Sequence, residues 1–453
     1  MEAENYLAGG YGIRLAMEAR KAGWLPMGRL AKVWQPLRLK GIQVSREFGT
    51  PFLAATQIFD LRPVPRKFLS LDRTNNAANR FVTPGMILVT CSGNVGRATL
   101  ACKPHEGILI SHDLLRVEPQ EEKLWGWLYA YLRAPQTRAM MTSAQYGHII
   151  KHLEVSHLNA LPMPVLRDEL LENFRWRVQS LLDKRNRAVQ LQDEAEQFFS
   201  DAIGEVQPTE NHEVGFTVPA SQIFAQRRRL EGGYWTPAAT AILRRFHHLG
   251  LTVQPLSKVS ERVWWMTRFK RVFGSEGDVP YMSADELFAL NAPITKRVVI
   301  EQADNASDYF VKAGWILMAC SGQVYGLNGS VALMTKQHEK AFFSHDLVRI
   351  IPKLDSIRSG YLFTVLGHPK LGRPLVIRNA YGTSIPHLEP ADIATFPVAR
   401  LSNSLENEIA DKMEKAVNLR AEADALENDI AADAEAIIER FMSGDMRDVV
   451  VSP

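Results

Sequence analysis

The sequence predicts an α+β protein made of two tandem α/β domains, each followed by a long helix, with the two helices paired as an antiparallel coiled coil. Three observations lead to this prediction. The chain of 453 residues is longer than one hydrophobic core usually organises, most of it is an internal repeat, and each repeat ends in a heptad pattern. The predicted parts are domain 1 (1–166), helix 1 (167–205), domain 2 (206–401), helix 2 (402–443) and a C-terminal tail (444–453).

The repeat is clearest in one stretch. GMILVTCSGNVGRATLACK, at residues 85–103, returns as GWILMACSGQVYGLNGSVAL at residues 314–333. Further matching segments keep the same order along the chain: LAKV (30–33) with LSKV (256–259), GTPFLAATQIF (49–59) with DVPYMSADELF (278–288), SHD (111–113) with SHD (344–346), and YGHIIKHLE (146–154) with YGTSIPHLE (381–389). The intervals differ by only a few residues, so the chain contains two copies of one unit and is not a short-period solenoid.

Each copy has the same expected secondary structure. Runs of β-forming residues lie between Gly, Asn and Pro-His turn signals, which predicts strands joined by loops. The expected strands include 85–90 and 108–117 in the first copy, and 315–319 and 341–351 in the second. In LWGWLYAYLRAPQTRAMM (124–141), apolar residues recur at helical spacing until Pro135 breaks the helix.

The last part of each copy changes to a heptad pattern, in which apolar residues recur in alternating steps of three and four. The seam positions are Leu171, Phe174, Val178, Leu181, Ala188, Ala195, Phe199 and Ala202 in the first copy, and Glu406, Ile409, Met413, Ala416, Ala423, Ile430, Ala434 and Ile437 in the second. Arg185 and Gln192 interrupt the first seam, and Arg420 and Glu427 interrupt the second at the matching places. Polar residues at such positions fix the register of a coiled coil at some cost in stability.

One alternative is that each long helix packs independently on its own domain. Helices of about 35 residues would span roughly 50 Å at 1.5 Å per residue, which is too long for a small domain to cover. Each helix therefore needs a partner of similar length, and we expect the two helices to pair with each other in antiparallel fashion.

Composition limits the class of protein. Apolar residues make up 46% of the chain and charged residues 23%, as in ordinary globular proteins. No uncharged apolar stretch approaches about 18 residues and no signal-peptide pattern is found, so we expect a cytoplasmic protein. The three cysteines have no CxxC spacing, so neither a disulfide framework nor a zinc site is expected.

Positive charge and aromatic residues gather in RVWWMTRFKRVF, at residues 262–273, although the net charge of the chain is only +3. The relevant side chains are Trp264, Trp265, Arg268, Lys270 and Arg271. The cations could neutralise DNA phosphates while one tryptophan packs beneath them or lies against the DNA backbone. The first copy keeps Arg38 and Lys40 in VWQPLRLKGIQV. A solvated strand edge would carry similar charges, but the mixture with aromatic residues favours DNA contact.

A Cys, a His and an Asp recur in both copies, which raises a thiol nucleophile with an imidazole base as an alternative. The two sets are Cys91, His112 and Asp113, and Cys320, His345 and Asp346. Adjacent residues on one strand point to opposite faces, so the His and the Asp are not expected to join one relay. A cysteine at the end of an apolar run is typical of a buried strand, and we expect each His-Asp pair to brace a loop by hydrogen bonds.

The duplicated segments resemble the specificity (S) subunits of type I restriction-modification systems. The resemblance covers nearly the whole chain. It rests on the proline-aromatic strands GTPFLAATQIF and DVPYMSADELF, the Ser-Gly turn after each G-x-I-L strand, the YG turns at Tyr146 and Tyr381, and the proline-bearing strand before each long helix. The two cysteines beside the Ser-Gly turns and the acidic second helix depart from the family's usual pattern.

The resemblance implies a non-catalytic subunit in which domains 1 and 2 are target-recognition domains. Each of them would read one half of a split DNA sequence, while the helices act as a spacer and dock the methyltransferase subunits. The implied partners are double-stranded DNA, two methyltransferase (M) subunits and restriction (R) subunits. The sequence has no GxxxxGK[ST] phosphate loop and no Asn/Asp-Pro-Pro-aromatic methyltransferase motif. S-adenosylmethionine, ATP and magnesium are therefore expected only on the partner subunits.

The resemblance also suggests which residues contact DNA. A Ser-Gly turn can bring backbone N–H groups close to phosphates, because glycine has no Cβ. Neighbouring longer side chains can read bases, since arginine matches guanine and amide side chains match adenine in the major groove. The predicted DNA-binding residues are Arg38, Lys40, Ser92, Asn94, Arg97, Tyr146, His148, Lys151, Trp264, Trp265, Arg268, Lys270, Arg271, Ser321, Gln323, Tyr325 and Tyr381.

A second hypothesis is a duplicated structural adaptor that binds protein partners without DNA specificity. The acidic second helix fits either function, whereas the basic-aromatic segment favours DNA binding.

Overall fold

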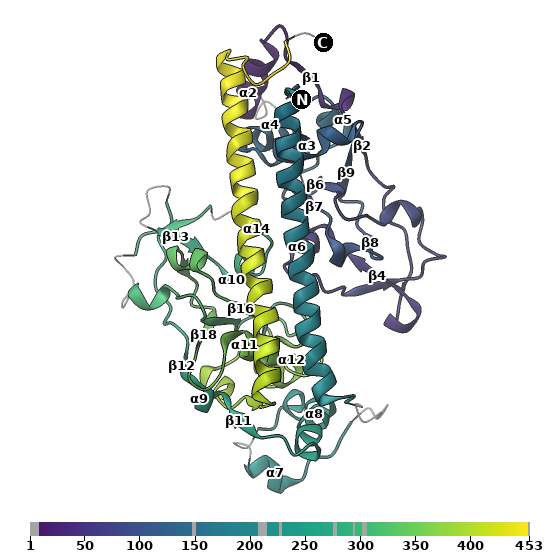
Figure 1. Cartoon of the computed structure of the whole chain (residues 1–453). Helices are drawn as coiled ribbons and strands as arrows, with labels where there is room; N and C mark the ends of the chain where they lie inside the picture. Colours follow the sequence, from purple (N-terminus) through teal and green to yellow (C-terminus); the bar gives the residue numbers. More distant parts are fainter. Residues whose placement is uncertain are drawn as a thin grey trace. The chain divides into compact units, whose positions relative to one another are not determined.

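The computed structural model describes residues 9–146, 151–206, 215–225, 229–274, 279–292, 295–300 and 306–451. The chain forms two compact units: unit 1 comprises Met1–Arg187 and Glu422–Pro453, and unit 2 comprises Ala188–Ala421. Both units combine small sheets with helices in a similar order along the chain (Figure 1). The predicted α+β fold class is therefore confirmed. Among the described residues, no helix has the length and apolar character needed to cross a membrane.

The described part of unit 1 has two four-stranded sheets, in the orders β2-β9-β6-β7 and β3-β5-β4-β8, and a separate pair formed by β1 and β10. The strands are β1 Trp24–Pro26, β2 Ala31–Trp34, β3 Gln43–Val44, β4 Thr50–Leu53, β5 Lys67–Leu69, β6 Ile87–Thr90, β7 Ala98–Leu100, β8 Leu109–Ile110, β9 Leu114–Pro119 and β10 Pro162–Pro164. The helices are α2 Gly9–Glu18, α3 Trp125–Arg133, α4 Pro135–Ala144 and α5 Val155–Asn159, followed by the first half of α6 Asp168–Ile203.

The described part of unit 2 repeats this arrangement, with sheets in the orders β12-β18-β15-β16 and β14-β13-β17 and a pair formed by β11 and β19. The strands are β11 Val253–Pro255, β12 Ser260–Trp264, β13 Val279–Met282, β14 Arg297–Val298, β15 Ile316–Ala319, β16 Val331–Leu333, β17 Phe342–Phe343, β18 Leu347–Pro352 and β19 Pro397–Ala399. The helices are α7 Ala220–Ala225, α8 Pro237–His248, α9 Leu256–Val259, α10 Ala284–Leu287, α11 Ser359–Gly367, α12 Arg373–Ile377 and α13 Pro390–Ile393, and α14 Asn403–Ser443 begins here.

Strand registers confirm the internal repeat. Trp34 of β2 lies opposite Arg116 of β9, and Trp264 of β12 lies opposite Arg349 of β18. In both units the second strand, β2 or β12, therefore pairs with the strand that follows the Ser-His-Asp segment, β9 or β18.

Two expected strands are wrong in detail. The predicted strand 108–117 is divided into β8 and β9 by a turn at 111–113, and the predicted strand 341–351 is divided into β17 and β18 by a bend at 344–346. The physical reason is that Ser and Asp side chains in these segments hydrogen-bond to each other and to local backbone, which competes with the ladder of a strand.

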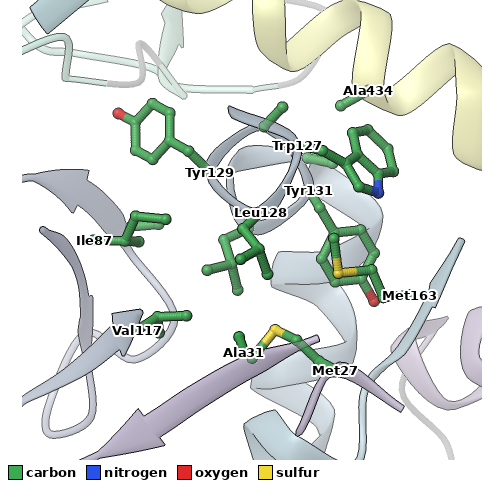
Figure 2. Packing of buried hydrophobic residues seen from close by; sticks show 14 of the residues in the cluster. Met27, Ala31, Ile87, Val117, Trp127, Leu128, Tyr129, Tyr131, Met163 and Ala434 are labelled. Carbon is green, nitrogen blue, oxygen red and sulfur yellow. The ribbon is translucent and has the colours of Figure 1, made fainter. Parts of the chain in front are cut away.

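The core of unit 1 surrounds α3, whose aromatic residues Trp127, Tyr129 and Tyr131 are fully buried (Figure 2). Leu128 lies toward Ile87 and Val117 of the sheet β2-β9-β6-β7, and Trp127 lies beside Ala434 of α14. The indole N–H of Trp127 donates to the carbonyl oxygen of Pro164 at 2.8 Å, which satisfies its only polar atom inside the core. Pro135 ends α3 as predicted, and the chain starts a new helix, α4, at that proline.

The helices α6 and α14 lie side by side and run in opposite directions within each unit (Figure 1). In unit 1, Arg177 of α6 forms an ion pair with Asp433 of α14 and Lys184 forms one with Glu422, both at 2.5 Å. In unit 2, Lys412 of α14 pairs with Glu194 of α6 at 2.7 Å. Partner numbers fall on one helix as they rise on the other, which confirms the antiparallel pairing.

The predicted seam is buried almost throughout. All of its residues in the first helix are buried except the half-buried Ala202, and all of those in the second helix are buried, Glu406 included. The interrupting residues pair between the helices as the register requires. Arg185 donates to Glu427 at 2.8 Å in unit 1, and Arg420 donates to Gln192 in unit 2. In each unit, the polar residues that interrupt the two seams therefore contact each other.

The alternative in which each helix packs on its own domain is also partly right, because the helices do both. A Cβ on Gly126 of α3 would lie 2.3 Å from the backbone nitrogen of Arg175 in α6, and one on Gly360 of α11 would lie 2.6 Å from the carbonyl oxygen of Ala410 in α14. These two glycines occupy matching places in the repeat. They allow one helix of each domain to approach the backbone of the long helix that follows it.

Candidate nucleic-acid interface

A cluster of serine, aspartate and histidine side chains joins three separate loops of unit 1. Ser92, in the Ser-Gly turn after β6, donates to Asp113 Oδ1 at 3.1 Å and lies 3.3 Å from His152 Nδ1. Ser111 donates to the other carboxylate oxygen of Asp113 at 2.9 Å. Backbone bonds reinforce the junction, since the Cys91 N–H donates to the carbonyl oxygen of Asp113 at 3.1 Å.

Unit 2 contains the same cluster. Ser321 lies 3.4 Å from Asp346 Oδ1 and 3.0 Å from His387 Nδ1, and Ser344 donates to Asp346 Oδ2 at 3.2 Å. The Cys320 N–H again donates to the carbonyl oxygen of the aspartate, at 3.2 Å. The repeated sequence segments are therefore repeated in three dimensions, as one junction that holds the Ser-Gly turn, the Ser-His-Asp turn and the segment after the YG turn together.

A buried arginine supports each Ser-His-Asp turn from inside the sheet. Arg116 and Arg349 have no exposed surface, and their guanidinium groups donate to backbone carbonyl oxygens of the turn: Arg116 to Ser111 at 3.0 Å, and Arg349 to Leu347 at 3.0 Å and Phe343 at 3.3 Å. Burial lowers the pKa of both guanidinium groups to about 10. Sequence reasoning missed these arginines, although the repeated pattern SHDL-x-R contained the signal.

The thiol-imidazole alternative does not match the geometry. Cys91 Sγ lies 3.7 Å from the carbonyl oxygen of His112 and accepts a hydrogen bond from Gln35 at 3.3 Å. Burial raises the pKa of Cys91 to about 12 and that of Cys320 to about 11, so both thiols stay protonated at neutral pH. The Cys91 thiol thus contacts a side-chain amide and a backbone carbonyl oxygen, and both cysteines are buried.

One argument used against that alternative was nevertheless wrong. His112 Nε2 lies 3.7 Å from Asp113 Oδ1, and His345 Nε2 lies 3.4 Å from Asp346 Oδ1, so the adjacent side chains do converge. They converge because they belong to a turn or bend and not to a strand. The expected bracing role agrees with the geometry, with the aspartate at the centre of each cluster.

The basic segments have the same exposure pattern in both units. Arg38 and Lys40 follow β2, Arg268 and Lys270 follow β12, and all four are exposed. No ion pair joins these four side chains to a carboxylate among the described residues. Arg271 is held differently, because it donates to the hydroxyl oxygen of Tyr281 at 2.9 Å.

The two adjacent tryptophans of unit 2 differ in environment. Trp264 is half-buried and packs edge-to-face on Trp315, with ring centroids 5.4 Å apart. Trp265 is 39% exposed. Trp264 therefore packs inside unit 2, whereas the exposed side chain of Trp265 is available to contact a ligand.

The remaining predicted residues are in varied situations. Asn94 is exposed and accepts from Arg138 at 3.2 Å, whereas the guanidinium of Arg97 stacks 3.9 Å from the ring of Phe59. Burial, helped by Arg138 and Arg133, lowers the pKa of Arg97 to about 10. Gln323 is exposed and donates to Ser384 at 2.8 Å, and the Tyr325 side chain is 70% exposed.

Four further candidates belong to the YG segments. The hydroxyl groups of Tyr146 and Tyr381 donate to Glu154 and Glu389 respectively, each at 2.7 Å. Lys151 is half-buried, and its carbonyl oxygen accepts from the Gly93 N–H at 3.1 Å. His148 lies outside the described residues.

One cavity of about 330 Å³ in unit 2 brings several predicted residues together. It is lined by Trp265, Arg268, Ser321 and Tyr381, and by Asp346 and His387 of the duplicated cluster. Within the described ranges, no three His, Cys, Asp or Glu side chains are placed to hold a metal ion. Aromatic, cationic and hydrogen-bonding groups therefore meet at one cavity.

No protein-family model matches the chain, and no curated protein matches it. Three solved structures are similar to it along nearly its whole length, each with 13% sequence identity. The first is the S subunit of a type I restriction-modification system from M. genitalium, with a TM-score of 0.30, covering 95% of this chain and 98% of that one. The second is the HsdS subunit from Thermoanaerobacter tengcongensis, with a TM-score of 0.28 and coverages of 93% and 96%. The third is a chain from a structure of a type I R-M system determined for its assembly and conformational transition, with a TM-score of 0.28 and coverages of 93% and 97%. These three solved structures are of type I restriction-modification systems, the family that the sequence of this chain resembles.

Proposed function

We propose that this protein is a DNA sequence-specificity subunit, which reads a bipartite DNA target with its two units and positions methyltransferase and restriction subunits on that target. The observation that carries the proposal is the duplicated basic surface. Arg38 and Lys40 in unit 1, and Arg268 and Lys270 in unit 2, are exposed cations at matching places beside matching Ser-Asp-His clusters. Cations without carboxylate partners are suited to phosphate contacts.

Differences between the copies supply a reason for two different half-sites. The Ser-Asp-His cluster is the same in both copies, whereas the side chains around it differ. Gln35 and Asn94 in unit 1 correspond to Trp265 and Gln323 in unit 2. Phosphate contacts position a protein on the duplex, and such variable side chains reach base edges.

The catalytic steps belong to the partner subunits in this proposal. S-adenosylmethionine would bind the M subunits, and ATP and magnesium would bind the partner subunits that act on the DNA. This chain would supply sequence recognition and a scaffold, with α6 and α14 as the spacer and the docking element.

The adaptor hypothesis loses part of its support. The acidic second helix fits either function by its sequence, but Glu422, Glu427 and Asp433 of α14 all pair with basic residues of α6 in unit 1. Much of the acidic charge of this helix therefore serves the pairing of the two helices.

The proposal predicts salt-sensitive binding to random duplex DNA. In a fluorescence-anisotropy titration at several salt concentrations, the affinity should fall steeply as salt rises, because each phosphate contact releases a counterion. The double substitution Arg268→Gln/Lys270→Gln should reduce the slope of log K against log salt by roughly 2, since each lost contact removes about 0.9. A matched control is Lys258→Gln/Lys353→Gln, which removes two exposed lysines at the other end of the β12-β18 pair.

The control should leave the slope unchanged. A salt-independent affinity of the unmodified protein would contradict DNA binding, and equal slopes for both double variants would contradict the placement of the DNA contacts on the basic segment.

A second prediction concerns the spacing of the two half-sites. Seven residues inserted in heptad register after Arg187 of α6 and after Ala421 of α14 should lengthen both helices by about 10 Å. DNA rises about 3.4 Å per base pair, so the separation of the recognised half-sites should increase by roughly three base pairs. Methylome sequencing of cells that carry the complete system measures the result.

Each half-site should keep its own sequence in this experiment. The control is the same insertion in α6 alone, which shifts the seam of only one helix and should destabilise the pair. Altered half-site bases with an unchanged spacing would exclude the spacer role of the helices.

A further inference from the structure

The two copies of the site differ at one position beside the Ser-Asp-His cluster. Gln35 follows Trp34 at the end of β2, and Trp265 follows Trp264 at the end of β12. The Gln35 side-chain amide donates to Cys91 Sγ at 3.3 Å and to the carbonyl oxygen of His112 at 2.7 Å. In unit 1 these two hydrogen bonds therefore hold the Gln35 side chain against the Ser-Asp-His cluster.

In unit 2, Trp265 does not form the hydrogen bonds that Gln35 forms in unit 1. Cys320 and His345, which correspond to Cys91 and His112, line the cavity of about 330 Å³ together with Trp265. Among the described residues, the Trp265 indole N–H has no hydrogen-bond partner. The exchange of glutamine for tryptophan thus accompanies a cavity with an aromatic wall.

The cavity also contains a hydrogen-bond acceptor and a cation. The Asp346 carboxylate is about one-third exposed and accepts hydrogen bonds from Ser321 and Ser344, which leaves acceptor capacity on both oxygens. The neighbouring His345 is mostly neutral at pH 7, because burial lowers the pKa of its imidazole. Arg268, exposed at the cavity and without an ion-pair partner among the described residues, can hold an anion.

An aromatic wall, a carboxylate acceptor and an adjacent cation match the three parts of one nucleotide. An exposed tryptophan ring can stack on any of the four bases, because every base has an aromatic face. A carboxylate accepts from the exocyclic amino group of cytosine, adenine or guanine, which thymine lacks. Arginine contacts the phosphate attached to that base.

We propose that the unit 2 cavity binds a single unstacked nucleobase, held against Trp265 with its amino edge toward Asp346 and its phosphate beside Arg268. In the described part of unit 1 the matching position holds Gln35, bonded to Cys91 and His112, in place of the aromatic wall. The inference deepens the proposed function: one recognition unit would read its half-site partly through an unstacked base. Enzymes and binding proteins that extract a base from a duplex hold it by the same combination of stacking and edge contacts.

The test uses the full chain and the fluorescent nucleotide 2-aminopurine deoxyriboside monophosphate, which carries an amino group and is quenched when its base stacks on an aromatic ring. The unmodified protein should quench the probe saturably. Trp265→Gln, which installs the residue that unit 1 has at this position, should weaken binding roughly tenfold or more, as loss of a base-stacking residue does. Trp265→Phe should retain most of the binding, and circular dichroism checks that both variants fold.

Competition defines the ligand. dCMP, dAMP and dGMP should displace the probe more readily than dTMP, and Asp346→Asn should reduce this difference. Inorganic phosphate that competed as well as dCMP would show an anion site without base recognition and would overturn the proposal. Equal binding by Trp265→Gln and the unmodified protein would also overturn it.

The outcome is separable from that of the proposed function. Salt-dependent binding of an ordinary duplex is measured by anisotropy on the unmodified protein, independently of the nucleotide probe, because exposed cations such as Lys270 set the salt slope. Saturable quenching of the probe together with salt-dependent duplex binding supports a base pocket in a DNA-binding protein. Nucleotide binding by a protein that shows no salt-dependent duplex binding would leave the pocket standing and contradict the specificity-subunit proposal.

Discussion

Replacing Glu427 with alanine is expected to lower the free energy of unfolding of unit 1 by about 3–5 kcal/mol, because it leaves a buried cation without its main counter-charge. Glu427 and Arg185 have only 2% and 4% of their side chains exposed, and they are joined at 2.8 Å between α14 and α6. Glu427 also accepts from the buried hydroxyl of Tyr129. Denaturant titration, with hydrogen exchange of the α6 and α14 amides, measures the loss.

The surroundings of Arg185 explain why the effect should be large. Its Nε and Nη1 atoms have no hydrogen-bond partner among the described residues. The remaining carboxylate, on Asp424, lies 3.5 Å from Arg185 Nη2, and burial raises its pKa to about 6. Asp424 lies farther from Arg185 than Glu427 does and is more exposed, so it is a weaker counter-charge than Glu427.

Three variants serve as controls. Glu427→Gln should cost less than Glu427→Ala, because an amide can still accept from Arg185, as Gln192 does from Arg420 in unit 2. The double substitution Arg185→Leu/Glu427→Leu should recover most of the loss, since removing both charges also removes their desolvation cost. Asp429→Ala, at an exposed position of the same helix, should change stability by less than about 0.5 kcal/mol. A double variant as unstable as Glu427→Ala would show that packing, and not the isolated charge, explains the effect.

Replacing Arg349 with leucine is expected to destabilise unit 2 by about 3 kcal/mol and to open the bend at 344–346. The Arg349 guanidinium donates to the carbonyl oxygens of Leu347, Phe343 and Ser344 at 3.0, 3.3 and 3.4 Å. Without it these buried carbonyl oxygens lose their donor, at about 1–3 kcal/mol each, offset in part by removal of a buried charge. Hydrogen-exchange mass spectrometry should show faster exchange around 343–349.

Arg116→Leu is the matched variant in unit 1, where Arg116 donates to Ser111 and Leu114. Each substitution should increase exchange in its own turn and leave the matching turn of the other unit unchanged. Arg349→Lys should be intermediate, because an ammonium group donates in fewer fixed directions than a guanidinium. Unchanged exchange at 343–349 in Arg349→Leu would show that the bend is stable without its buried donor.

Much of the architecture could be read from the sequence because it depends on periodicity. The heptad steps from Leu171 to Phe199 and from Ile409 to Ile437 predicted which faces of the two helices are buried, and the polar slots at Arg185, Gln192, Arg420 and Glu427 predicted where the register is pinned. Burial follows from spacing along one helix, which is a local property of the chain. The internal repeat then implied that what holds for one unit holds for the other.

The candidate site was predictable only in outline. The Ser-Gly turns, the basic segments and the Ser-His-Asp motifs were visible as residues, and they do lie at the duplicated junctions. The buried roles of Arg116 and Arg349 were not visible, because an arginine within an apolar strand has the same sequence signal whether it faces solvent or the carbonyl oxygens of a turn. The split of each expected long strand was missed for a related reason, since side-chain hydrogen bonds within the turn outweigh strand propensity there.

The distinction between Trp264 and Trp265, and between Gln35 and Trp265, depended on contacts across long stretches of chain. Trp264 is covered because Trp315, about 50 residues later, packs on its ring. Gln35 is fixed by hydrogen bonds to Cys91 and His112, which lie more than 50 residues later in the chain. Trp265 instead lines a cavity with Cys320 and His345, the residues that match Cys91 and His112 in unit 2. Periodicity specifies which residues share a face, but a cavity forms from the sizes and hydrogen bonds of side chains that only folding brings together.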